Sequence, residues 1–333
     1  MISLRNALPF LVVVAACSDT SRMAMGDVNS IIVVADDSLW AEVQDTVLST
    51  LQPRIFAVRD EQTFNLTHTS PYSENWADLR RFRQILAIGT PEAPWVQSAL
   101  AQADTSVEPP AVVEANNVWA RNQHVTTLVI PEQGAADAVR DRVAELQHLM
   151  DGRYRDWATS RMFISGHNEA LADTLRSVGG FTLDIPQVYR WRRDTENTFV
   201  FLNDQPDASE LVRWLTVTWR PLDESEPTAE ALLEWRDSIA STLYDWEQQT
   251  QRDPIHEAAI EAPGAGGLEV RGVWTGTLDD FPQAGPFVAR IVDCPAQDRR
   301  YLLDTWLYAP ARDKYQYMIQ LETLLERFRC GAE

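Results

Sequence analysis

The chain has few basic residues. Its 333 residues include 29 lysines and arginines against 49 aspartates and glutamates, which gives a formal net charge of -20. Because binding to nucleic acid depends on clustered Lys and Arg, this balance argues against nucleic acid as a partner. Lysine itself is almost absent, since Lys314 is the only one. We attribute that bias to a GC-rich genome and draw no functional conclusion from it.

The common catalytic signatures are also missing. There is no G-x-S-x-G nucleophile elbow, zinc-binding H-E-x-x-H, Walker glycine loop or EF-hand loop. Ser165, Gly166 and His167 are adjacent, but they fall in a predicted helix, so we interpret them as structural. His256 beside Glu257 has the pattern of a solvated pair in a polar linker. The sequence therefore predicts no metal and no cofactor.

Cysteine is scarce, with three in the whole chain. Cys17 lies near the N-terminus, in a segment that we interpret as a lipoprotein signal, so Cys294 and Cys330 are the two cysteines of the mature chain. A disulfide between them would close a loop of about 36 residues and stabilise the fold by about 4 kcal/mol in the chain-entropy model. The alternative is two free thiols, and the sequence does not distinguish these possibilities because it fixes no distance between the two Cα atoms.

Long apolar runs are absent, but a short one precedes Cys17. The stretch Ala7–Ala16 follows Arg5 and ends in small residues, and at about ten residues it is too short to span a bilayer. This pattern looks like a bacterial lipoprotein signal, in which the cysteine is acylated and becomes the first mature residue. We therefore expect a signal peptide over 1–16, a lipidated tether over 17–29, and attachment to the outer membrane facing the periplasm. The alternatives are a cleaved secretory peptide with an ordinary cysteine and an uncleaved membrane anchor.

The next part, 30–180, has the pattern of an α/β half. The β-branched run Ser30–Ala35 predicts a buried strand, and Ser38 can cap the helix that follows and ends at Pro53. Further strands and helices alternate after it, as in a β-α-β fold. Between 134 and 180 the spacing predicts a long helical stretch that Asp151 and Gly152 interrupt.

Strands are denser in the remaining part, 181–333. Three of them, Leu268–Trp274, Phe287–Asp293 and Tyr301–Tyr308, follow one another as expected for an antiparallel sheet, and an amphipathic helix over Lys314–Arg329 closes the chain. The fold class that we predict is therefore α+β, with a mixed sheet in the N-terminal half, long central helices and a largely antiparallel C-terminal sheet. The two halves can also pack as one domain.

Short blocks in the C-terminal third carry a family likeness. They are Arg271–Trp274, Gly285–Phe287, Tyr308–Pro310 and Gln320–Glu322, and three earlier blocks agree with them: Val33–Trp40, Asn117–Gln123 and Leu183–Pro186. In this order the blocks resemble the domain of unknown function 4837, an uncharacterised family of bacterial lipoproteins, over nearly the whole mature chain. The resemblance implies a lipoprotein of a Gram-negative cell envelope and no established activity.

The same blocks supply the candidate pocket. Arg271 can bind an anion, Trp274 and Phe287 offer aromatic walls, and small or rigid residues permit close approach, so the candidate residues are Arg271, Gly272, Trp274, Gly285, Pro286, Phe287, Trp119 and Arg121. The alternative is a hairpin core in which Arg271 pairs with a carboxylate such as Asp293.

Two functional hypotheses follow. The first is a non-catalytic, lipid-anchored domain that binds or scaffolds another envelope protein. The second is an envelope hydrolase acting on glycan or lipid, with Arg271 as an anion clamp and Asp280 or Asp293 as the base. An open cleft around Arg271 and Trp274 that faces a carboxylate would favour the hydrolase.

Overall fold

The computed structural model describes residues 22–244, 247–262, 265–277 and 283–331. Its contacts divide the chain into two units, the first made of residues up to 52 and 64–147 and the second of 53–63 and 148–333. This division differs from the predicted boundary after residue 180, because helices in the 168–179 region pack on the C-terminal sheet. Cys17 and the predicted signal peptide lie outside the described residues.

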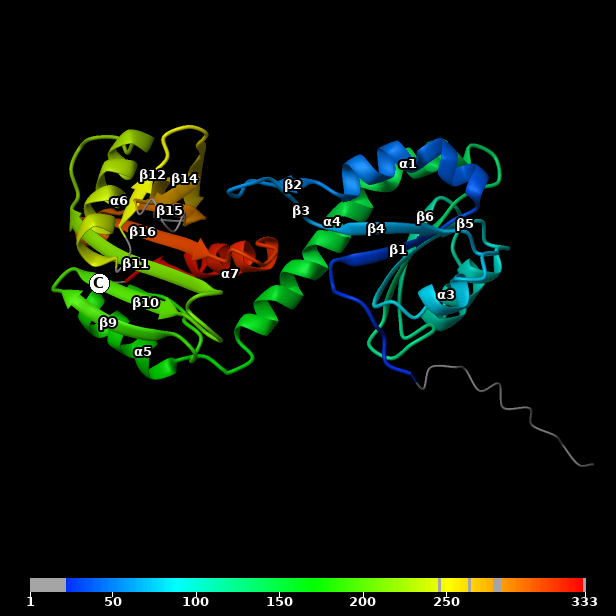
Figure 1. Ribbon diagram of the computed structural model, residues 1–333, viewed down its shortest axis with the longest axis horizontal. Helices are drawn as coiled ribbons and strands as arrows, with labels where there is room; N and C mark the ends of the chain where they lie inside the picture. Colours follow the sequence, from blue (N-terminus) through cyan, green and yellow to red (C-terminus); the bar gives the residue numbers. More distant parts are fainter. Residues whose placement is uncertain (1–21, 245–246, 263–264, 278–282, 332–333) are drawn as a thin grey trace, which may run out of the picture. The chain divides into compact units, whose positions relative to one another are not determined.

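Unit 1 is built on a five-stranded sheet with the order β4-β1-β5-β7-β6. Four strands are parallel and the edge strand β6 is antiparallel, so this is the mixed sheet that the alternating pattern predicted (Figure 1). The strands are β1 (Ser30–Val34), β4 (Asn65–Thr69), β5 (Gln84–Gly89), β6 (Ala111–Asn116) and β7 (His124–Val129).

The helices of unit 1 are amphipathic and cover this sheet. Helix α1 (Asp37–Leu51) buries Trp40, Val43, Val47 and Leu51 at helical spacing. It begins after Asp36 and has no side-chain cap, so the predicted capping role of Ser38 is wrong. Helices α2 (Trp76–Leu79) and α3 (Pro94–Ala103) pack with the apolar cluster that includes Ile32, Ile85 and Val125.

Part of the predicted tether belongs to unit 1. Met23 and Met25 form isolated parallel bridges with Arg121 and Phe82, and the amide of Ala24 donates to the carbonyl of Arg121. Residues 23–25 therefore form backbone hydrogen bonds with the segments next to β5 and β7. The polar composition that suggested a free tether up to residue 29 did not reveal these contacts, since backbone groups make them.

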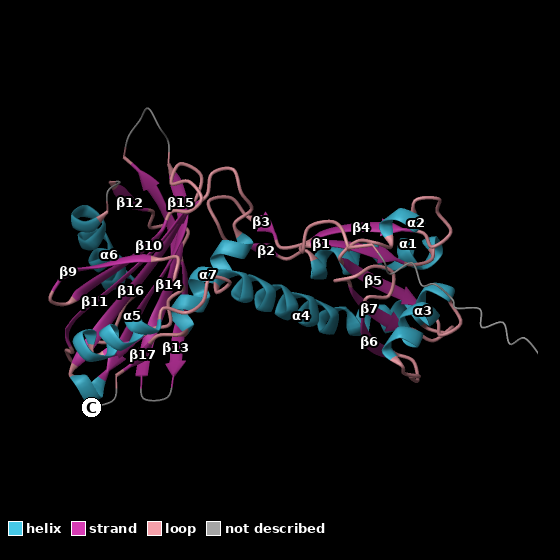
Figure 2. Ribbon diagram, turned by 90° about the horizontal axis from the view of Figure 1, so that it is seen from below, coloured by secondary structure: helices cyan, strands magenta, loops and turns pink. Residues whose placement is uncertain are grey.

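Unit 2 is built on an eight-stranded sheet with the order β12-β14-β15-β16-β11-β10-β9, in which β13 also pairs with β14 (Figure 2). Every pairing in it is antiparallel, as predicted for this half. Its strands are β9 (Arg190–Thr195), β10 (Thr198–Asn203), β11 (Val212–Pro221), β12 (Gln248–Thr250), β13 (His256–Ala262), β14 (Ala265–Gly276), β15 (Ala284–Cys294) and β16 (Arg299–Tyr308). Short strands make two further pairs, β2 (Arg54–Ile55) with β3 (Glu61–Gln62) and β8 (Phe181–Thr182) with β17 (Arg329–Cys330).

Helices cover both faces of this sheet. On one face α5 (Glu169–Thr174), the π-helix η1 (Leu175–Gly179) and α7 (Tyr315–Glu326) bury their apolar residues against Phe199, Leu215 and Leu303. On the other face α6 (Ala229–Leu243) packs on Trp214, Trp274 and Trp306. Alternation along each strand sends neighbouring side chains to these two separate cores.

The long helix α4 (Ala135–Met162) runs through the predicted interruption at Asp151 and Gly152. A glycine inside a helix costs only about 1 kcal/mol, and Asp151 accepts hydrogen bonds from Arg155 and Tyr315. The helix ends at Met162, so Ser165 lies in the turn after it and not in a helix as predicted. His167 forms an isolated antiparallel bridge with Pro186. No helix among the described residues is both long and apolar enough to cross a membrane.

The structure also joins Cys294 at the end of β15 to Cys330 on β17 by a disulfide, with 5.8 Å between the Cα atoms. The bond links the large sheet to the chain that follows α7. Together the two units confirm the predicted α+β class, with a mixed N-terminal and an antiparallel C-terminal sheet.

Candidate functional site

The residues of the predicted pocket do not line one cleft. Arg271 and Trp274 are three positions apart on β14, so their side chains leave opposite faces of the sheet. Trp274 and Phe287 are completely buried in the core under α6. Trp119 and Arg121 belong to unit 1, where Trp119 packs edge-on against Trp76 and Arg121 contributes its backbone to the bridge with Met23. Arg271 therefore does not share an open cleft with Trp274 and Phe287.

The Gly-Pro-Phe block serves close packing. The two blocks do lie on neighbouring strands, with Trp274 opposite Gly285 and Val273 opposite Pro286. A Cβ atom on Gly285 would lie 1.8 Å from the carbonyl oxygen of Leu307 and 2.7 Å from Nε1 of Trp274. A Cβ on Gly272 would lie 2.5 Å from the ring of Phe287. Both glycines leave room for core aromatics and not for a ligand.

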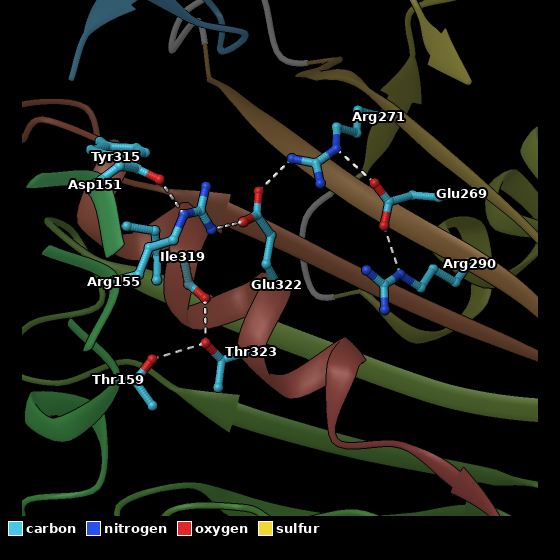
Figure 3. Close-up of polar contacts among 10 residues, drawn as sticks. All are labelled: Asp151, Arg155, Thr159, Glu269, Arg271, Arg290, Tyr315, Ile319, Glu322 and Thr323. Carbon is cyan, nitrogen blue, oxygen red and sulfur yellow. Dashed lines mark hydrogen bonds and ion pairs between the residues drawn. The ribbon is translucent and has the colours of Figure 1, made fainter. Parts of the chain in front are cut away.

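Arg271 is part of a chain of alternating charges on the α7 face of the sheet. Its Nε donates to Glu269 at 2.7 Å and its Nη1 donates to Glu322 of α7. Glu322 also accepts from Arg155 at 2.9 Å, and Glu269 accepts from Arg290 at 2.6 Å (Figure 3). We call the set Asp151, Arg155, Glu322, Arg271, Glu269 and Arg290 the ion-pair network.

The pKa shifts follow from this pairing. Burial would by itself raise the pKa of the Glu322 carboxyl, but Arg271 and Arg155 outweigh it and hold that pKa below its ordinary value. Burial would likewise lower the pKa of Arg271, but Glu322 and Glu269 raise it. Glu322 is thus a stably charged partner and not a poised base. Asp293, the alternative partner of Arg271, pairs instead with Arg300, and the other proposed base, Asp280, lies outside the described residues.

A second charged cluster lies in the core under α6, and no sequence motif indicates it. Arg236 and Asp304 are 0% exposed, and Nε of Arg236 donates to Asp304 at 3.1 Å. Tyr244 donates to the second oxygen of Asp304, while Thr250 and Gln248 accept from Arg236. Burial raises the pKa of Asp304 despite Arg236 and Tyr244. This cluster is closed to solvent and has a structural role.

The open feature of unit 2 is a cavity of about 600 Å³ at the end of the sheet where β10 ends and β11 begins. Residues from α4, the turn after it, both strands and α7 line it. None of these described lining residues is acidic, although acids outnumber bases in the chain. The polar residues that line it include three arginines and four amides: Arg161, Arg213, Arg312, Asn203, Gln205, Gln316 and Gln320. We call it the arginine cavity.

The arginines of this cavity are paired differently from those of the ion-pair network. Arg213 donates to the side-chain oxygen of Gln320 at 3.2 Å and to the carbonyl of Gln205 at 2.9 Å, so its partners are neutral. Its guanidinium lies 5.7 Å from the ring centre of Tyr317. Arg161 lies over the ring of Trp157 and forms no ion pair within the described residues. Arg312 alone has an acidic partner, Glu210, at 2.6 Å.

No catalytic pair is assembled at the cavity. Ser165 lines it, but the Ser165 Oγ is buried and has no hydrogen-bond partner among the described residues. His167 is directed elsewhere, since its Nδ1 bonds the carboxylate of Asp184 at 2.7 Å and Asp184 also accepts from Arg327. Nucleophilic catalysis needs the nucleophile and its base within hydrogen-bonding reach. Among the described lining residues, Ser165 has no such base.

The geometry defines an α+β protein whose C-terminal antiparallel sheet is covered by helices on both faces and carries a polar cavity. The family model for the domain of unknown function DUF4837 matches residues 168–327, which supports the resemblance to that family in this part of the chain. A second model, the domain of unknown function DUF8532, matches residues 24–150. The blocks Val33–Trp40 and Asn117–Gln123 fall within this second match, so the expected likeness to one family over nearly the whole chain was too wide.

No curated protein matches the chain. Among solved structures, the chain is similar to the Ran-binding protein Mog1p of Saccharomyces cerevisiae, at 12% identity and a TM-score of 0.32, over 46% of this chain and 90% of that one. It is also similar to CyanoP, the PsbP of Synechocystis sp. PCC 6803, at 11% identity and a TM-score of 0.31, over 45% and 86% of the two chains. These distant likenesses carry no functional argument.

Proposed function

We propose that this chain is a lipid-anchored, non-catalytic binding protein of the bacterial cell envelope. The observation that carries the binding role is the arginine cavity, which gathers hydrogen-bond donors and three guanidinium groups without an acid or a nucleophile-base pair. The ion-pair network supports the same choice over the hydrolase, because Arg271 already has two carboxylate partners. In this proposal, an envelope protein partner binds to this chain, and the chain acts as a ligand-binding domain and not as an enzyme.

The anchor in this proposal is Cys17, acylated and inserted in the outer membrane so that both units face the periplasm. Its support is the apolar stretch Ala7–Ala16 with small residues before the cysteine. The disulfide between Cys294 and Cys330 agrees with an oxidising compartment. Stable attachment needs more than one acyl chain, at about 0.8 kcal/mol per buried methylene, and the lipoprotein modification supplies several.

Membrane fractionation tests the anchor. We expect the Cys17→Ser variant to leave the membrane fraction, and mass spectrometry of the wild-type N-terminus to find an acylated cysteine. Normal processing with unchanged membrane retention of the variant would contradict the anchor.

A cavity-blocking substitution tests the binding role. Val188 lines the cavity and is 42% exposed, so Val188→Trp adds bulk there without entering the core. Val178 is 47% exposed and lies outside the cavity, which makes Val178→Trp the matched control. We expect small molecules that co-purify with the native protein to be lost from Val188→Trp alone. Equal retention by both variants would contradict binding in the cavity.

A further inference from the structure

We infer that the ligand of the arginine cavity is a small organic carboxylate whose apolar part lies against the cavity wall. This inference rests on the proposed binding function and adds the chemical class of the ligand.

The charge of the cavity favours an anionic ligand. Arg213 and Arg161 have no carboxylate partner among the described residues, in a chain with 49 acidic residues available to supply one. In unit 2 the arginines of the ion-pair network each have at least one acidic partner. Two cations that line one cavity without acids favour an anion and repel a cation.

Two buried amides supply hydrogen-bond donors to the cavity. Asn203 and Gln320 are 3% and 2% exposed and both line the cavity. The side-chain oxygen of Asn203 accepts from the backbone amide of Gln205, and that of Gln320 accepts from Arg213, so the orientation of each amide is fixed by a donor. Each amide nitrogen is left without a partner among the described residues. A ligand that accepts hydrogen bonds would satisfy these two donors.

Arg213 is held ready for such a ligand. Two neutral hydrogen bonds and the ring of Tyr317 fix its guanidinium. Its Nε is buried without a hydrogen-bond partner in the described structure, so the second N–H groups of Nη1 and Nη2 are the donors left for a ligand. A planar guanidinium donates in a fork that matches the two oxygens of a carboxylate. Because the side chain is already ordered, binding costs less conformational entropy than it would for a free arginine.

The rest of the lining explains why the ligand is organic and small. Met162 and Leu211 are buried at the cavity, and Ile164 and Val188 are 82% and 42% exposed there. Apolar side chains exposed beside a polar site favour a ligand with an apolar body. A volume of about 600 Å³ lies within the range of small-molecule sites.

Three probes of equal length test the ligand class. Hexanoate, hexanamide and hexylamine share a six-carbon chain and carry an anionic, a neutral and a cationic end group. Saturation-transfer NMR with the full chain measures the binding of each. We expect hexanoate to bind, hexanamide to bind about 10- to 100-fold more weakly, and hexylamine to bind more weakly still. The Arg161→Gln and Arg213→Gln variants should each weaken hexanoate by a similar factor. The control Arg176→Gln removes an exposed arginine outside the cavity and should leave binding unchanged.

The failures of the two proposals are distinguishable. If hexanamide or hexylamine binds as tightly as hexanoate and the Val188→Trp variant abolishes that binding, the carboxylate class is wrong and the binding cavity stands. If hexanoate binds equally to wild type, Val188→Trp and Arg213→Gln, the ligand lies elsewhere and both proposals fail. Failure of hexanoate to bind folded wild-type protein overturns the carboxylate class.

Discussion

Arg271 and Arg213 lie in the same unit, each on a strand of one sheet and each with a partner on α7, but their surroundings differ. Arg271 donates to two carboxylates that themselves bind further arginines. Arg213 donates to an amide and a backbone carbonyl and lines an acid-free cavity. An arginine in a motif is thus not by itself a sign of a ligand site. The two arginines differ in two respects, namely whether a carboxylate neutralises the guanidinium and whether the residue lines an open cavity.

The largest effect is expected where pairing is most buried. Arg236→Met leaves the carboxylate of Asp304 in the core without its cation, which should lower the free energy of unfolding by about 3–5 kcal/mol. Urea unfolding of wild type and variant measures this difference. Arg252 pairs with Asp237 at the surface, so Arg252→Met should change stability by less than about 1 kcal/mol. Equal effects of both substitutions would contradict a structural role for the buried cluster.

A substitution in the ion-pair network should lower the free energy of unfolding by a smaller amount. Glu322→Gln keeps the shape of the side chain but removes the charge between Arg155 and Arg271, which should cost about 1–3 kcal/mol. Asp173 is exposed and pairs only with Arg176, so Asp173→Asn serves as the control in the same urea experiment. A Glu322→Gln variant as stable as wild type would mean that the network is not what holds α7 to the sheet.

The same carboxylate makes stability depend on pH. The pKa of Glu322 is lowered on folding from an unfolded value near 4.5, so its charge stabilises the fold above that pH. This contribution is lost as the pH falls through the folded pKa. The stability difference between wild type and Glu322→Gln should therefore be constant at about pH 6–8 and shrink below pH 4.5. A difference that grows in acid would have the wrong sign for a paired carboxylate.

The smallest effect on stability is expected in the arginine cavity. Arg161 is exposed and has no acidic partner in the described structure, so Arg161→Gln should change the free energy of unfolding by less than about 0.5 kcal/mol. Arg271→Gln, which leaves Glu269 and Glu322 each with one arginine fewer, should cost more. A thermal melt of the two variants side by side sharpens the comparison. A larger drop in melting temperature for Arg161→Gln than for Arg271→Gln would contradict the expected order.

Local patterns predicted much of the fold. The β-branched run at Ser30 and the apolar spacing from Leu39 to Leu51 became β1 and α1, because buried strands and amphipathic helices have distinct periods. The continuity of α4 through Gly152 was not predictable, since contacts from Asp151 to residues far along the chain accompany it.

The arginine cavity could not be predicted for a similar reason. Its residues come from positions between Arg161 and Gln320, on elements whose pairing only the fold defines. One local signal existed, because Arg213 lies inside the apolar strand β11 between Val212 and Trp214. The glycines of the two blocks, Gly272 and Gly285, are needed for close packing of the sheet core. From the sequence alone we interpret them as the rim of a pocket.

One measurement tests the difference between the two arginines directly. NMR of the arginine side chains in ¹⁵N-labelled protein follows each Nε–H group while hexanoate is added. The account predicts that the Nε–H signal of Arg213 shifts with saturation and that the signal of Arg271 does not move. A shift of Arg271 with no change at Arg213 would contradict it.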